Sequence, residues 1–547
     1  MCGHPQLQLL IAGKTLTNLH ALSIEQRLNT VPFASVQLAF SALEQLDEEG
    51  GTLLPGQPIE IKADEHIVFS GTITTHNINL SLIGCIVTLN CHCLVGLTTL
   101  PRSRIFQDMS DRDIAAELLH GHDVQMHFTG PTLHHKCVIQ HQLTDWDFLL
   151  QRLRAIGLVA RCSGQMLDIM APALTPDAGF LLARQDLISL DLMVDGSQQV
   201  AGLRLSAWDP NNQALEVAEA EAVDFPVNER LVASRLATAQ PPSISTTPVA
   251  GEYDSPELQY LANAELMRSR LAMIQGRITA LGLHLAQPGQ TLLLQEYGDH
   301  VSGQYYISGV KFELTPGAAP QTHFDIGLPA EAKQQVPASA PLSPSLFIGK
   351  VLDVNHDPDG ASRIKVHCPL IDPAGHGVWA RLATLQAGNG SGTTFRPAEG
   401  SEVILGLTSA NPRDVVILGA CHSSAITTPW DEATLHGYRS PNGLTISLDD
   451  DKQEIRISTN DGTLLHLSQD ANATLQLADQ YQNKIQLSKH GMRLESSSIH
   501  ISTNDFTLEA RSDINIKGSN VRMESTAQGE IRSAGHLTLR GAIVSIN

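Results

Sequence analysis

The sequence predicts a mainly β protein in three parts: an α+β region with barrel-like sheets, a small closed barrel, and a C-terminal ladder of short strands. Three observations support this prediction. Short apolar strand patterns bounded by turn residues run through the chain, three helix signals interrupt the first part, and an internal repeat occupies residues 442–547. Aromatic residues make up only 4% of the chain and charged residues 17%, a composition that favours extended β structure over a compact enzyme.

The α+β region spans residues 1–328 and begins with strands separated by turn residues. Two barrel-like halves are expected here. The expected strands are Leu7–Ile11, Val36–Phe40, Ile59–Ile61, Ile67–Thr74, Ile86–Cys93, Leu158–Arg161, Met166–Met170, Gly276–Leu283, Thr291–Glu296 and Tyr305–Leu314.

Three helices are expected within this region, and a capping pattern predicts where each of them begins. Ser110 precedes a first turn with two acidic residues. Thr144 opens an amphipathic stretch that ends at Gly157, a residue type suited to the left-handed helix end. A third helix begins at Ser255, followed by proline and an acid, and is expected to end at Gly276.

Residues 329–345 are rich in proline, alanine and serine, and are therefore expected to form a linker. Five short strand patterns with glycine-rich connections follow in residues 346–421 and predict a closed barrel of the OB type. Residues 422–441 form a short connector. The expected barrel strands are Phe347–Val354, Arg363–Cys368, Gly377–Ala383, Glu402–Leu407 and Asp414–Gly419.

The ladder at 442–547 consists of apolar pairs spaced by two residues, so both members of a pair lie on one strand face. The pairs recur every nine or ten residues at first and mostly every seven or eight from Ile485 onward. One chain needs roughly 20 residues to circle a parallel β-helix, so a repeat of this length builds one wall only. Three copies can enclose a core, which predicts an intertwined homotrimeric β-helix needle. A single-chain antiparallel meander is the alternative, and the hairpin signals Asn442-Gly443 and Asp461-Gly462 occur only early.

Charge and targeting signals narrow the class of protein. The net charge of 36 − 57 = −21 opposes nucleic-acid binding, which requires a basic surface. Eight irregularly placed cysteines suggest free thiols in a reducing compartment. Residues 1–14 lack the basic segment of a signal peptide, and no stretch approaches 18 apolar residues. Synthesis is expected in the cytoplasm, without a cleaved signal peptide.

Three stretches of the barrel match a known family: GKVLDVNHDPDGASRIKVHCP (349–369), VWARLATLQAGNGSGTTFRPAEGSEVILGL (378–407) and NPRDVVILGAC (411–421). They resemble the central spikes of contractile injection systems, namely the VgrG proteins of type VI secretion, the spikes of extracellular phage-tail-like particles, and phage hub-and-needle proteins. Residues 105–119 and 141–169 resemble the hub portion, and LRGAIVSIN (539–547) resembles the last needle strand.

The resemblance implies a homotrimeric hub that closes the baseplate end of an inner tube, with the barrels collaring an outward needle. Inner-tube and baseplate proteins, carried effectors and, transiently, the target membrane are the implied partners. A PAAR-type tip protein is expected to dock on Ala542, Ile543, Val544, Ser545, Ile546 and Asn547. We expect neither a lysozyme domain in the connector nor a fused toxin. The short hub and residues 22–40 favour an extracellular particle, with delivery outward on firing.

No catalytic, phosphate-binding or dinucleotide motif occurs, so neither enzymatic activity nor a cofactor is expected. Asn355–Gly360 resembles the start of a calcium loop, but Val366 stands where a bidentate glutamate is required. A barrel turn is therefore favoured. The loop Gly388–Gly392 is expected to be flexible.

Cys91, His92 and Cys93, with His134, His135 and Cys137, are candidate zinc ligands. Core or interface thiols are favoured instead, because Cys-x-Cys in a strand puts both thiols on one face without the usual Cys-x2-Cys bend. His120 and His122 are expected at a helix end. A trimeric β-helical enzyme that degrades polysaccharide is the alternative function, and an adhesin that uses the barrel is a third.

Overall fold

The computed structural model describes residues 6–41, 51–81, 84–197, 199–237, 244–328, 346–409, 411–469 and 474–546. The chain forms two compact units, Met1–Thr428 and Pro429–Asn547, which are described separately. The predicted linker at 329–345 lies outside the described residues. We refer to residues 6–328 as the hub region and to residues 346–421 as the barrel; both belong to the first unit.

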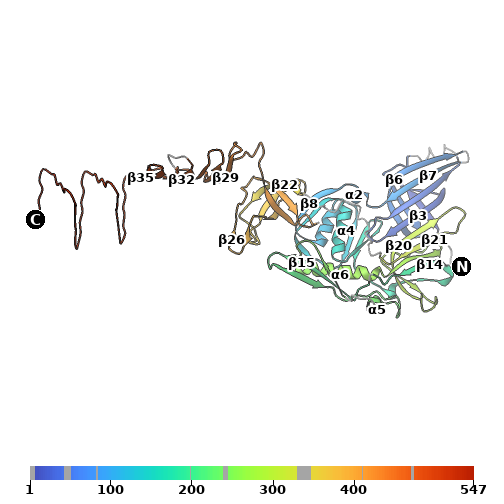
Figure 1. Ribbon diagram of the computed structural model, residues 1–547. Coiled ribbons are helices and arrows are strands. Elements are labelled where there is room, and N and C mark those ends of the chain that lie inside the picture. Colours follow the sequence, from blue (N-terminus) through green and yellow to red (C-terminus); the bar gives the residue numbers. More distant parts are fainter. Residues whose placement is uncertain are drawn as a thin grey trace. The chain divides into compact units, whose positions relative to one another are not determined.

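A single 13-stranded sheet is the main element of the hub region (Figure 1). It joins strands from both ends of the region, because β20 pairs with β3 in antiparallel register from Gly309↔Arg27 to Leu314↔Leu22. In spatial order the strands are β14 (Leu187–Val194), β18 (Ile274–Leu281), β21 (Gln321–Ile326), β20 (Gly303–Leu314), β3 (Leu19–Arg27), β4 (Phe33–Phe40), β7 (Gly84–His92), β6 (His66–Ser81), β5 (Pro58–Ala63), β1 (Leu7–Ile11) and β2 (Lys14–Leu16), with β19 (Thr291–Leu294) and β13 (Phe180–Leu182) branching from β20.

The two halves of this sheet have separate cores. One core is built on β1 and β3 to β7, with Val36, Leu38 and Leu89 fully buried. The other is built on β18 to β21, with Ile278 and Phe324 at its centre. The expectation of two barrel-like halves is thus met by two cores, but one continuous sheet joins them.

An α+β layer is inserted between the two halves, and its core includes Ile114, Phe148, Leu149 and Leu167. A short helix, α2 (Val95–Thr98), precedes this layer in the chain. The elements of the layer are β8 (Arg102–Ser110), α3 (Asp111–Leu119), β9 (Gln125–Thr129), β10 (His134–Leu143), α4 (Asp145–Ala155), β11 (Val159–Ser163) and β12 (Met166–Met170).

Two of the three predicted helices are confirmed with their caps. Ser110 and Asp113 form a reciprocal capping box at α3, and the Thr144 side chain accepts from the Asp147 N–H at α4. Helix α6 (Ser255–Leu271) begins one residue after its N-cap Asp254, and its end at Gly276 was wrongly predicted. Gly276 lies in strand β18 instead, paired with Leu192.

A small sheet packs on α6. It consists of β16 (Ala214–Glu219), β15 (Gly202–Asp209) and β17 (Ile244–Pro248), and Leu205 and Ala207 meet Leu258 and Ala262 of the helix. The remaining hub elements are η1 (Pro176–Ala178), η2 (Arg184–Asp186) and α5 (Ala233–Ala237).

The predicted five-stranded closed barrel is confirmed. Its strands run in the order β22 (Leu346–Asp353), β23 (Ile364–His367), β24 (Val378–Leu382), β28 (Val415–Cys421) and β27 (Glu402–Leu407). Its interior holds Ile364, Val366, Ala380, Val403, Leu405 and Ile417. The glycine-rich loop at 388–392 lies in a small hairpin of β25 (Ala387–Gly388) and β26 (Ser391–Gly392).

The second unit, in the single chain, differs in part from the predicted β-helix needle. Its first half is an antiparallel seven-stranded meander, the alternative that the sequence left open. Each repeat leaves room for a strand of four or five residues and a turn, and the shortest repeat is the seven residues from Ile485 to Met492. Gly443 and Gly462 take the left-handed backbone at two of the turns. Residues 496–546 are described throughout and contain no strand. The strands are β29 (Leu435–Arg439), β30 (Thr445–Asp449), β31 (Glu454–Ser458), β32 (Leu464–Ser468), β33 (Leu475–Ala478), β34 (Lys484–Ser488) and β35 (Gly491–Glu495).

Candidate functional surfaces

The barrel is attached to the hub region by the ribbon of β8 and β10, which pair from His134↔Ser110 to Leu143↔Arg102. Ile139 of β10 belongs to the barrel core, and Ile105 and Cys137 pack beside it. At the same contact the rings of His141 and Phe347 meet edge to face, with centroids 5.9 Å apart. We call this contact between the hub region and the barrel the joint.

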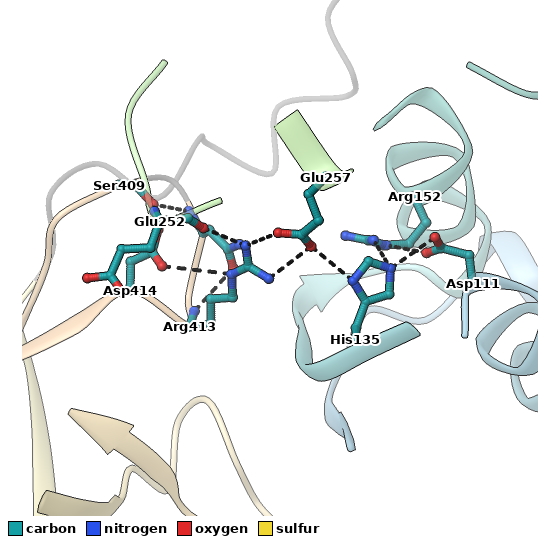
Figure 2. A network of polar contacts seen from close by, with 9 residues as sticks. Asp111, His135, Arg152, Glu252, Glu257, Ser409, Arg413 and Asp414 are labelled. Atoms are coloured by element: carbon teal, nitrogen blue, oxygen red, sulfur yellow. Dashed lines mark hydrogen bonds and ion pairs between the residues drawn. The ribbon is translucent and has the colours of Figure 1, made fainter. Parts of the chain in front are cut away.

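A polar cluster extends the joint beyond these apolar contacts (Figure 2). Arg413, from the loop between β27 and β28, donates through Nη1 and Nη2 to the two carboxylate oxygens of Glu257 on α6, at 3.1 and 2.7 Å. Its Nη2 also donates to the Glu252 carbonyl oxygen at 2.6 Å. This two-point geometry is the strong form of an arginine–carboxylate pair. A second ion pair, Lys136 Nζ to Asp359 Oδ1 at 2.7 Å, joins the same two parts.

His135 continues the cluster into the hub region, as Figure 2 shows. It is only 3% exposed, and its Nδ1 lies 2.9 Å from Glu257 Oε1 while its Nε2 lies 3.0 Å from Asp111 Oδ2. Arg152 of α4 donates through Nε to Asp111 Oδ1 at 2.8 Å, and its Nη2 lies 2.8 Å from His135 Nε2. Helices α3, α4 and α6 therefore all supply a charged side chain to one buried histidine.

The electrostatics of the cluster favour the charged forms. Burial opposes charge on the His135 ring, but its bonds to Asp111 and Glu257 outweigh burial and raise the pKa of His135. Burial likewise opposes ionisation of Glu257, but hydrogen bonds from His135 and Arg413 hold the pKa of Glu257 well below its ordinary value. The cluster is thus held together as ions.

A second surface is the apolar face of the meander. Cross-strand partners such as Ile446↔Ile457 and Leu465↔Leu477 stand on the same face, so the apolar pairs form one continuous stripe from β30 to β35. Ten of these side chains are between 37% and 62% exposed, whereas Ser447 and Asp449 on the other face are buried. The apolar stripe consists of Ile446, Leu448, Ile455, Ile457, Leu465, Leu467, Leu475, Leu477, Ile485, Leu487, Met492 and Leu494.

The predicted tip-docking residues lie in the strand-free segment, and Asn547 is outside the described residues. Ile543 and Ile546 are 86% and 83% exposed, and Val544 is half exposed. These side chains leave apolar surface open, but nothing shows what covers it. Their docking role stays a prediction.

The other residues singled out in the sequence lie apart from one another. Cys91 and Cys93 belong to the core of the first sheet half, whereas Cys137 packs at the joint. Among the described residues, no group of three or more His, Cys, Asp or Glu side chains is placed to hold a metal ion. Asn355–Gly360 forms the turn between β22 and β23, where Arg363 donates to Asp357 and Gly360 has a positive φ.

Sequence reasoning missed the joint cluster. His135 and Glu257 are 122 residues apart in the chain, and Arg413 is a further 156 residues on. His135 stood out only as a weak zinc candidate. A buried histidine between two carboxylates has no local spacing signature, so only the folded chain reveals it.

The hub region, an OB-type barrel and a strand ladder, in that order, define the fold of a VgrG-like spike protein. Residues 347–422 match the family described as the type VI secretion system/phage-baseplate injector OB domain. Residues 4–316, more than half of the chain, match the Alg8 N-terminal domain, and the chain belongs to that family. Among curated proteins, no sequence matches the chain.

Solved structures agree with this fold. The lidded PdpA–VgrG complex of Francisella matches with a TM-score of 0.56 at 11% identity, over 89% of this chain and 79% of that one. The lidless PdpA–VgrG complex matches with a TM-score of 0.56 at 11% identity, over 87% of this chain and 98% of that one. In the described part of the chain, no helix has both the length and the hydropathy needed to cross a membrane.

Proposed function

We propose that the protein is the non-enzymatic central spike of a contractile injection system and that it works as a homotrimer. The apolar stripe is the observation that carries this proposal. Twelve apolar side chains share one face of a seven-stranded sheet, and most of them remain substantially exposed in the single chain. An exposed apolar surface of this extent requires a partner.

Two further copies of the same chain fit this requirement. Full burial of a large aliphatic side chain stabilises by about 1.5–3 kcal/mol, so covering the exposed half of twelve contributes on the order of 10 kcal/mol per chain. Three sheets whose stripes face a common axis bury all three at once. The same packing supplies neighbouring strands to residues 496–546, whose apolar side chains recur every seven or eight residues.

The parts then have mechanical roles. The hub region sits at the baseplate end of the inner tube. The needle transmits the load of sheath contraction to the target envelope. No bond-breaking chemistry is needed for this work. The protein acts within the assembled particle.

The tip of the needle is proposed to bind a PAAR-type protein through residues 542–547. The exposure of Ile543, Val544 and Ile546 supports this assignment, since an exposed apolar end favours a cap. An extracellular phage-tail-like particle is preferred over type VI secretion because the hub region is short and residues 22–40 resemble those particles.

Molar mass in solution tests the proposal. Light scattering on the full chain is expected to give three times 59.0 kDa, about 177 kDa, at every concentration tested. A monomer near 59.0 kDa would contradict it. Turnover of a polysaccharide by the purified trimer would instead favour the depolymerase alternative.

A further inference from the structure

The joint contains one titratable group that faces partners of both charges. His135 on β10 meets Asp111 on α3, Arg152 on α4 and Glu257 on α6, and Glu257 in turn holds Arg413 of the barrel (Figure 2). The imidazole therefore stands between the hub helices and the barrel loop. Its protonation state decides how many charged contacts the joint can make.

The two contacts at Nε2 require opposite protonation states of that nitrogen. A hydrogen on Nε2 donates to Asp111 Oδ2 at 3.0 Å but faces the Arg152 Nη2 at 2.8 Å. Without that hydrogen, the one lone pair of Nε2 accepts from Arg152, and Asp111 Oδ2 loses its hydrogen bond from the ring. In both states Nδ1–H can donate to Glu257. The two states thus differ in their Nε2 partner and in the charge beside Glu257.

The surrounding charges favour the protonated ring. Asp111, Glu257 and Asp414 supply three carboxylates, whereas Arg152 and Arg413 supply two guanidinium groups. The imidazolium makes the cluster neutral when all three carboxylates are ionised. Tyr253, whose ring lies 5.9 Å from the Arg413 guanidinium, and Glu252, which pairs with Arg381 at 3.2 Å, lie at the barrel end of the cluster.

We propose that His135 is a pH-sensitive latch that holds the barrel against the hub region when its ring is protonated and loosens that contact when the ring is neutral. This inference concerns contacts within one chain and does not depend on the proposed function. The latch consists of Asp111, His135, Arg152, Glu257 and Arg413.

The direction of the pH effect follows from the His135 pKa, which is raised in the folded chain. The stabilisation is therefore fully present below the ordinary histidine value of about 6.5 and is lost as the pH rises through the folded value. Glu257 and Asp111 have lowered pKa values, so their contribution is lost only on the acid side, as the pH falls below the ordinary carboxyl range. The latch is tightest in mildly acidic solution.

Backbone hydrogen exchange of the full chain tests the latch. Exchange in peptides covering 134–140 and 411–416 is measured between about pH 6 and pH 8.5 and corrected for the intrinsic pH dependence of amide exchange. In the wild type, protection of both peptides is expected to fall as the pH rises. His135→Gln is expected to remove this pH dependence and to leave protection low throughout.

His141→Gln is the matched control, because His141 lies on the same strand at the same joint, against Phe347 rather than between carboxylates. It should keep the wild-type pH dependence. Glu257→Gln keeps a hydrogen-bonding side chain but removes one negative charge, so the midpoint should shift to lower pH. The latch is refuted if protection in the wild type does not change with pH, or if His135→Gln retains the change. Should His135→Gln fail to fold, an unshifted midpoint in Glu257→Gln refutes it instead.

Discussion

Gly276 is a position at which the neighbouring strand excludes any side chain. Its φ is +155°, and a Cβ built there would lie 2.1 Å from the carbonyl oxygen of Asp191 on the neighbouring strand. Helix α6 ends at Leu271, and Gly276 lies further on, in β18, where the close approach of β14 leaves room for a glycine alone. Pattern alone could not distinguish a helix-ending glycine from this one.

Replacing Gly276 with alanine is expected to destabilise the hub region by more than about 1 kcal/mol, since the added methyl group cannot fit without moving β14. The free energy of unfolding from urea titration measures the effect. Gly419→Ala in β28 is the control, because a Cβ there meets nothing within 4 Å. Equal stabilities of the two variants would contradict the steric argument.

At the joint, Arg413→Gln should loosen the barrel. The arginine is paired to Glu257 at both carboxylate oxygens and both side chains are largely buried. Removal of one partner from such a pair leaves an uncompensated charge and costs about 3–5 kcal/mol. A thermal transition of the barrel that separates from that of the hub region is the expected observation.

The comparison for Arg413→Gln is Arg396→Gln. Arg396 is a barrel residue that donates to the Val354 carbonyl oxygen at 3.1 Å, so it tests loss of a barrel arginine away from the joint. A single unchanged transition in Arg413→Gln would show that the apolar contacts of Ile139 alone hold the joint.

At the scale of elements, the change from meander to strand-free segment follows β35. A repeat of seven residues, from Ile485 to Met492, still provides a five-residue strand and a two-residue turn, because Ser488 pairs with Gly491. Residues 496–546 have apolar pairs spaced mostly by seven or eight residues but form no strand in the single chain. The ladder is predicted from its apolar pairs as one structure, although the hairpin signals at 442–443 and 461–462 occur only in its first half.

Ile457→Asp should prevent assembly by placing a carboxylate in the apolar stripe. A charge buried between three sheets is unpaired and costs several kcal/mol per copy. Light scattering is expected to show a lower molar mass than the wild type. Arg456→Ser alters the neighbouring residue on the opposite face and should leave the mass unchanged. An Ile457→Asp variant with the same molar mass as the wild type would argue against the apolar stripe as the interface.

For the whole molecule, the proposed docking surface for a tip protein is the exposed apolar segment at residues 542–547. Val544→Asp combined with Ile546→Asp should abolish co-purification of a coexpressed PAAR-type protein, because both substitutions replace exposed apolar side chains with charges. Arg540→Gln keeps the apolar end and should capture the tip protein normally. If the double variant captures the tip protein as well as the wild type does, the docking surface lies elsewhere.

The order of parts could be predicted from the sequence because each part has its own local pattern. Strands Leu7–Ile11, Met166–Met170 and Glu402–Leu407 have the predicted bounds, and the barrel closes as expected. Strand β8 was missed because its residues alternate irregularly between polar and apolar. The pairing of β20 with β3 and the latch residues could not be predicted, since both depend on contacts between residues far apart in the chain.

The pairing of β20 with β3 also determines how long one edge of β3 stays unpaired during synthesis. Strand β3 ends at Arg27, and its partner begins at Gly303, so roughly 280 residues must be translated before that edge is closed. At ribosomal speeds of about 5–20 residues per second, the edge stays open for roughly 15–55 s. An unpaired strand edge is a template for aggregation. Nascent chains of this protein are therefore expected to need chaperone protection until residue 314 has left the ribosome.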